Sequence, residues 1–186
     1  MTRAVVCTPL RIEQAAVRGL RPVHTGLGPR RSAAARLPAG PRIVAGLGGG
    51  LAAQVRPGDV VVASEVRGAG EAVPASFASL VDDLRELGLT VHIGPILSTD
   101  HPVRERERSS LAKTGALAVD MESAWLAPGA APFAVVRAIV DTANQPLLRV
   151  STIAHGLAGL RSLRRAVPAL AGWAAKPTTT LPREVR

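Results

Sequence analysis

Two apolar runs in the second half of the chain each end in an aspartate. Residues 117–119 precede Asp120, and residues 133–140 precede Asp141. Short runs of this kind predict strands that are buried on both faces. In open α/β sheets, ligands bind outside the carboxyl ends of the strands. We therefore expect Asp120 and Asp141 to face one shared crevice, while capping of the following helix is the alternative role for either residue.

Strand-like and helix-like segments alternate along the chain. The expected strands are residues 3–7, 42–45, 60–66, 90–97, 117–119 and 133–140, and the expected helices are residues 12–18, 29–37, 75–87, 103–113 and 151–175. This alternation predicts an α/β fold with three layers, α/β/α, around a mixed and mostly parallel sheet. The length suits one core, so we expect a single domain over residues 3–175. Residues 176–186, rich in Thr and Pro, are expected to form a flexible tail.

The formal net charge of +9 raises the question of nucleic-acid binding, because such proteins neutralise phosphates with basic side chains. The arginines of this chain are instead scattered and often lie beside acids, as in residues 104–108, which we interpret as the solvated face of a helix. No helix-turn-helix, zinc-finger or aromatic-on-strand pattern accompanies the charge. Nucleic acid is therefore not favoured as a partner.

The remaining composition indicates a cytoplasmic protein without a cofactor. Cys7 is the single cysteine, so it forms no internal disulfide and offers no metal-ligand spacing. We expect neither a metal nor an organic cofactor. The sequence lacks a run of eighteen apolar residues that would predict a transmembrane segment, and its first residues do not resemble a signal peptide.

Several motifs lie upstream of the two aspartates in a fixed order. They are CTPLRIE at residues 7–13, TGLG at 25–28, IVAGLGGGL at 43–51 and RPGDVVV at 56–62. Together with the acid-bearing strands, this order resembles the nucleoside phosphorylase and nucleosidase superfamily over nearly the whole chain. The methylthioadenosine/S-adenosylhomocysteine nucleosidases, the futalosine hydrolases and the hopanoid-associated phosphorylases are the most similar members. The resemblance implies a phosphorylase-type fold and an enzyme that cleaves the bond between a purine base and a ribose.

The family pattern implies roles for the acids. Asp141 matches the acid that protonates the leaving base or donates a hydrogen bond to it, and an apolar pocket would raise its pKa for that task. Glu122 matches the acid that binds the ribose hydroxyls, since a carboxylate accepts from two vicinal hydroxyls at once. Met121 would lie against the sugar, or would be an ordinary core methionine.

The nucleophile distinguishes two reactions. Glu13 matches the glutamate that activates water in nucleosidases, with an exposed position on a helix face as the alternative. Phosphorylases need hydroxyls and cations around phosphate, yet Leu47 replaces the usual serine or threonine in the glycine-rich turn that begins at Gly46. Arg30, near Gly28 at a helix start, could still hold an anion. We assign Gly28, Arg30, Gly46 and Leu47 to a pocket for water or phosphate, and we favour hydrolysis over phosphorolysis.

The sequence indicates less about how the base and the 5′ side of the substrate are bound. Pro102 and Val103 match the loop that contacts the base in the family. Residues 18–26 and 66–74 are too short for the segments that normally close over the 5′ side, so a 5′-substituted adenosine is expected, with adenosylhopane as the substrate of the phosphorolysis alternative. A non-catalytic basic binding protein on the same scaffold is the other alternative. Phosphate as a partner and a homodimer are left open.

Overall fold

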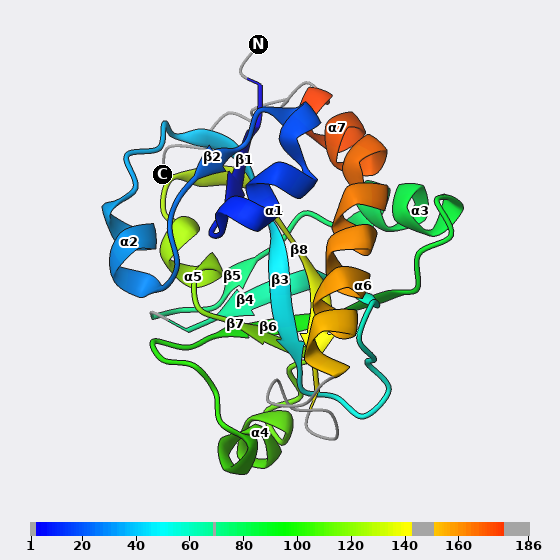
Figure 1. Cartoon of the computed structure of the whole chain (residues 1–186). Coiled ribbons are helices and arrows are strands. Elements are labelled where there is room, and N and C mark those ends of the chain that lie inside the picture. Colours follow the sequence, from blue (N-terminus) through cyan, green and yellow to red (C-terminus); the bar gives the residue numbers. More distant parts are fainter. Residues whose placement is uncertain (1–2, 69, 143–150, 177–186) are drawn as a thin grey trace.

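The computed structural model describes residues 3–68, 70–142 and 151–176 of the chain. The strands are β1 Val5–Thr8, β2 Val23–His24, β3 Gly40–Gly50, β4 Val60–Arg67, β5 Val73–Pro74, β6 Val91–Ser98, β7 Ala118–Asp120 and β8 Ala130–Asp141. The helices are α1 Arg11–Ala16, the 3-10 helix η1 Arg18–Leu20, α2 Pro29–Ala34, α3 Ala78–Glu86, α4 Glu105–Ala112, α5 Ser123–Leu126, α6 Ser151–Arg165 and α7 Val167–Ala175. Figure 1 shows how these elements are arranged.

All eight strands belong to one mixed sheet in the order β2-β1-β3-β7-β6-β4-β5. Strand β8 pairs with both β3 and β4, so β3, β7, β6, β4 and β8 form a closed circuit of neighbours. Five of the pairings are parallel and three are antiparallel. The expected α/β fold with a mixed, mostly parallel sheet is confirmed.

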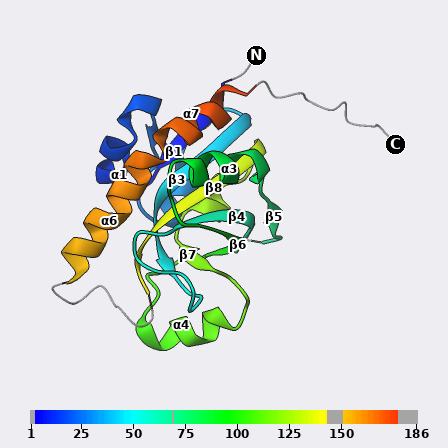
Figure 2. The ribbon, with the colours of Figure 1, turned by 90° about the vertical axis from the view of Figure 1, so that its right-hand side faces the viewer.

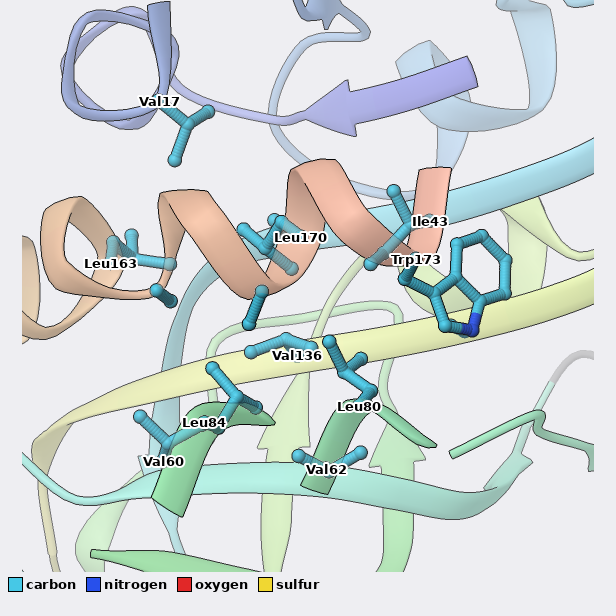
Figure 3. Packing of buried hydrophobic residues seen from close by; sticks show 14 of the residues in the cluster. Val17, Ile43, Val60, Val62, Leu80, Leu84, Val136, Leu163, Leu170 and Trp173 are labelled. Atoms are coloured by element: carbon cyan, nitrogen blue, oxygen red, sulfur yellow. The ribbon is translucent and has the colours of Figure 1, made fainter. Parts of the chain in front are cut away.

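Helices cover the sheet on opposite sides (Figures 1 and 2). The larger core lies under α1, α3, α6 and α7, and Figure 3 shows Leu163, Leu170 and Trp173 of α6 and α7 gathered near Val136 of β8. A second core packs α5 and the segment after α2 against the other face, with Phe133 among its buried residues. Because aromatic residues make up only 2% of the chain, both cores are mostly aliphatic. Within the part of the chain that the structure describes, no helix has the length and apolar character needed to cross a bilayer.

The last expected helix is two helices in the structure. Helix α6 ends at Arg165, and α7 starts again at Val167 with Pro168 in its first turn. Proline lacks the N–H that an uninterrupted helix would use and its ring clashes with the preceding turn, which explains the break. The predicted tail, apart from Lys176, lies outside the described residues.

The glycine-rich segment after residue 45 is a strand and not the turn that the sequence suggested. Strand β3 continues through Gly50, with a register irregularity against β8 between Gly48 and Gly49. In this strand Gly49 pairs with Val119 of β7 on one side and with Asp141 of β8 on the other. The glycine end of β3 thus lies between the two acid-bearing strands and brings their ends together.

Candidate functional site

A cavity of about 250 Å³ opens where the ends of β3, β7 and β8 meet. Asp120 and Asp141 both line it, as the positions of the two strand ends predicted. Five of the other residues selected from the sequence also contribute: the cavity wall includes Leu47, Pro102, Val103, Met121 and Glu122. Most of the remaining wall is apolar, from Leu10, Leu27, Val119 and Val140.

Glu13 is buried against Leu10 and Leu47 of the cavity wall and is not exposed on a helix face. Its side chain is 1% exposed, and its two carboxylate oxygens accept hydrogen bonds from the backbone N–H groups of Leu10 (2.7 Å) and Leu47 (2.6 Å). Burial raises the pKa of Glu13 to about 7, although Arg137 and the two backbone donors oppose that shift. A carboxylate that titrates near neutral pH suits a general base.

Arg137 is a fully buried residue of β8 that the sequence analysis did not select. Its Nη2 atom lies 2.7 Å from Asp120 Oδ2 and 3.2 Å from Glu122 Oε2, and its Nη1 donates to the carbonyl of Leu47. The signal for it was visible, because a charged residue inside the apolar strand 133–140 must find partners when it is buried. Arg137 is the cation around which the acids of the site are arranged.

The closeness of Glu13 and Arg137 depends on Gly46. A Cβ atom at residue 46 would lie 2.5 Å from Arg137 Nη1 and 2.8 Å from Glu13 Oε1, which is closer than real Cβ contacts. The glycine therefore lets two charged side chains approach the same strand from the helix α1 side and from β8.

Glu122 is a buried residue of the cavity wall. It is 3% exposed and accepts hydrogen bonds from the backbone N–H of Gly28 (3.1 Å) and from Arg137. Burial, joined by the negative charge of Asp120, raises the pKa of Glu122, while Arg137 opposes the rise. Met121 lies beside it, and a Cβ at Gly28 would be in contact with the Met121 methyl group.

The contacts of Asp120 indicate a mainly structural role. It accepts hydrogen bonds from the hydroxyls of Ser98 (2.6 Å) and Ser123, and from the backbone N–H groups of Glu122 and Ser123 at the start of α5. Burial alone would raise its pKa, but Arg137 and these donors hold the pKa below its ordinary value. Asp120 thus fixes Arg137 and the start of α5, which is close to the capping role considered from the sequence.

At the other end of the cavity, Asp141 pairs with Arg108 of α4. Both side chains are buried, and Arg108 Nη2 donates to Asp141 Oδ2 while Nη1 donates to the carbonyl of Gly50 (3.1 Å). Burial raises the pKa of Asp141, and Arg108 partly opposes the rise. Residues 104–108 are therefore not wholly a solvated face, because the last of these arginines points into the site. The local pattern gave no sign of this, since Arg104, Arg106 and Arg108 look alike in the sequence.

Four predicted site residues, Glu13, Gly28, Arg30 and Gly46, are not part of the cavity wall, and Arg30 is the one of them that makes no contact with the residues of the site described above. It is exposed on α2 and does not contribute to the cavity wall. Gly28, Gly46 and Leu47, which were assigned to the same pocket, do lie at the site through their contacts with Glu122, Glu13 and Arg137.

Comparisons with known proteins identify the family and agree with the fold. Residues 23–158 match the model of the phosphorylase superfamily, and no curated protein matches the chain in sequence. Among solved structures, the MTA/SAH nucleosidase of Streptococcus pneumoniae in complex with 8-aminoadenine has a TM-score of 0.70 at 20% identity, covering 91% of this chain and 99% of the nucleosidase. The nucleosidase of Colwellia psychrerythraea in complex with adenine gives 0.73 at 19% identity, covering 94% and 96%. That of Campylobacter jejuni gives 0.76 at 12% identity, covering 93% and 98%.

Proposed function

The chain belongs to the phosphorylase superfamily of glycosyl-bond-cleaving enzymes, and we propose that it hydrolyses the N-ribosidic bond of a 5′-substituted adenosine. In this proposal Glu13 activates water, Glu122 binds the ribose hydroxyls with Met121 against the sugar, and Asp141 is the acid to the base. Pro102 and Val103 border the base, and Leu47 borders the water.

The observation that carries the proposal is the charge at the sugar end of the site. Three buried carboxylates, those of Glu13, Asp120 and Glu122, surround the single guanidinium of Arg137. Cleavage of an N-ribosidic bond leaves positive charge on the sugar, and excess negative charge placed there stabilises the transition state more than the substrate.

The same charge favours water over phosphate as the nucleophile. A phosphate would have to approach the carboxylates of Glu13 and Glu122, and like charges repel. Phosphate would also need free cations and hydroxyls, but Arg30 lies outside the cavity wall, Arg137 and Arg108 are already paired with acids, and Leu47 supplies no hydroxyl. Glu13, held by the N–H of Leu47 and titrating near neutral pH, can accept a proton from water instead.

The apolar wall supports a substrate with an apolar 5′ group. Leu10, Leu27 and Val140 line the cavity, and Leu27 is about half exposed, so it lies towards solvent. The relatives from Streptococcus pneumoniae and Colwellia psychrerythraea were solved with 8-aminoadenine and adenine, which supports adenine as the base.

The test is release of adenine from methylthioadenosine in phosphate-free buffer made with ¹⁸O-labelled water. Hydrolysis predicts the free sugar with labelled oxygen at C1′, and Glu13→Gln should suppress it because the amide keeps the shape but cannot take up a proton. Glu86→Gln, an exposed change of the same kind on α3, is the matched control.

Three results would contradict the proposal in different ways. Strict dependence on phosphate, with a sugar 1-phosphate as product, would establish phosphorolysis. Phosphate-dependent turnover only with long 5′-alkyl adenosines would point to the adenosylhopane alternative. Binding without turnover across a panel of 5′-substituted adenosines would favour the non-catalytic binding protein.

A further inference from the structure

The ion pair between Arg108 and Asp141 lies inside the cavity and joins α4 to the end of β8. We propose that Arg108 is a positioning residue for the candidate acid: it fixes Oδ2 of Asp141, leaves Oδ1 to the cavity and sets the pH range in which Asp141 can pass a proton to the base. This inference rests on the proposed function, since it concerns the residue assigned as the acid.

The geometry holds the guanidinium in one place. Arg108 is 6% exposed, whereas Arg104 and Arg106 of the same segment are exposed. Its two terminal nitrogens are used separately, one on Asp141 Oδ2 and the other on the carbonyl of Gly50. A planar guanidinium tied at both nitrogens fixes the carboxylate that it binds.

Strand β3 leaves room for the ion pair between Arg108 and Asp141 only because residue 49 is a glycine. A Cβ at Gly49 would lie 2.9 Å from Asp141 Oδ1 and 3.1 Å from both terminal nitrogens of Arg108. Asp141 lines the cavity, and among the described residues none donates a hydrogen bond to its Oδ1.

Arg108 is the charged group that shifts the pKa of Asp141. The residues of β3 that face Asp141 are uncharged glycines, and the acids of the same cavity wall, Asp120 and Glu122, are paired with Arg137. Burial of Asp141 favours the proton, and Arg108 favours its loss. When the C1′–N bond breaks, its electron pair goes to the base. The proton on Oδ1 moves to a ring nitrogen, and the carboxylate that remains is stabilised by Arg108.

The first experiment needs no substrate. The carboxyl signals of ¹³C-labelled aspartate are titrated in the wild-type protein and in Arg108→Gln, with Asp141→Asn used to assign the Asp141 signal. Because an adjacent arginine lowers the pKa of an aspartate by about one to three units, we expect Asp141 to titrate about one to three pH units higher in Arg108→Gln. Arg106→Gln, an exposed change on the same helix, should titrate as the wild type does. An unchanged Asp141 titration in Arg108→Gln overturns the proposal.

The second experiment uses turnover. The limb of the kcat/KM pH profile that depends on Asp141 should move upwards by the same amount in Arg108→Gln, while the Glu13 limb stays in place. A uniform loss of rate with an unmoved profile would show a merely structural role. If no nucleoside is cleaved, the proposed function fails, and the carboxyl titration still decides the role of Arg108.

A lysine at the same position covers the case in which Arg108→Gln does not fold. Arg108→Lys keeps the charge, so Asp141 should still titrate close to its wild-type pH. The lysine lacks the planar fork with which the guanidinium ties Oδ2 and the Gly50 carbonyl, so kcat should fall while KM changes little. Wild-type kcat in Arg108→Lys would remove the positioning role.

Discussion

Two buried arginines lie at the candidate site, Arg108 in the cavity wall and Arg137 among the acids beside it, and they serve different numbers of acids. After the proposed roles, we call the side of Asp141 the base end and the side of Glu122 the sugar end. Within the described residues, Arg108 at the base end forms an ion pair with Asp141 alone, so that end has one cation for one acid. Arg137 at the sugar end is shared among Asp120, Glu122 and, at longer range, Glu13. Burial raises the pKa values of Glu13 and Glu122, and the single guanidinium of Arg137 opposes this rise without cancelling it.

This difference matches the charges that bond cleavage creates. The sugar becomes more positive and benefits from the excess of carboxylates, while the base becomes more negative and needs a proton or a donor. Asp141 beside Arg108 can supply that proton, and Glu122 and Glu13 face the other partner. The comparison would be wrong if replacing Arg108 and replacing Arg137 changed stability and activity in the same way.

The largest expected effect follows from removing Arg137. Arg137→Met keeps most of the buried volume but leaves Asp120 and Glu122 without their cation. Breaking a buried ion pair in this way costs about 3 to 5 kcal/mol, so the free energy of unfolding should fall by that amount and activity should be lost. Urea unfolding at constant pH measures the change, with Arg106→Met on the surface of α4 as the control. A loss below about 1 kcal/mol, within the range of surface ion pairs, would show that the acids do not depend on Arg137.

Asp141→Asn tests the base end. The amide can still accept a hydrogen bond from Arg108, so the fold should be retained, but it cannot deliver a proton. General acids contribute about 10²- to 10⁴-fold, and kcat should fall by that factor. Circular dichroism checks the fold, and Asp82→Asn, an exposed change on α3, is the control. A variant that keeps more than about a tenth of the rate would exclude Asp141 from the chemistry.

The base end also shows what the sequence could predict. Asp120 and Asp141 were predicted to face the cavity because each ends a short apolar run, and strand ends of an α/β sheet are where ligands bind, whereas Glu122 was selected from the resemblance to the family. Arg108 was missed because the side of α4 that faces the cavity depends on tertiary packing. The helix is short and charged on nearly every side, so its own pattern gives no inward face.

The sugar end was predicted in part. Glu13 was selected, but its burial was not foreseen, because the carboxylate is satisfied by backbone donors from Leu10 and Leu47, the second of which is 34 residues away. The segment from Gly46 was interpreted as a turn, since glycine usually interrupts strands. In the structure the glycine instead admits Glu13 and Arg137 side by side, which is a contact between distant parts of the chain.

The titration of Glu13 makes the stability of the folded protein depend on pH, which tests the sugar end separately from the base end. Its pKa is about 7 in the folded protein and close to the ordinary 4.5 when unfolded, so the folded state binds the proton more tightly. This contribution to stability is fully present below pH 4.5 and is lost as the pH rises to about 7. The difference in unfolding free energy between the wild type and Glu13→Gln should change by on the order of 3 kcal/mol across that window.

Denaturant unfolding at a series of pH values measures this change. The comparison with Glu13→Gln removes the contributions of other groups, which titrate in both proteins. Glu86→Gln should show no such difference, because that residue is exposed. A flat difference for Glu13→Gln would mean that Glu13 is ionised throughout and that Arg137 balances the sugar end after all.

The smallest effect concerns how Glu122 recognises the sugar. Glu122→Ala should lower kcat/KM for ribosides more than for 2′-deoxyribosides, because only the riboside loses a hydrogen bond from its 2′-hydroxyl to the carboxylate. A hydrogen bond to a charged group contributes about 1.5 to 3 kcal/mol, so the riboside preference should shrink by about tenfold or more. The ratio of the two kcat/KM values measures this preference.

Alanine also leaves the N–H of Gly28 and the Arg137 guanidinium without the Glu122 carboxylate as acceptor, so Glu122→Gln is needed as a second variant. General damage would lower both substrates equally and keep the ratio unchanged. Equal losses in both variants would show that Glu122 only balances Arg137, and would leave the negative charge of the sugar end without a contact to the sugar.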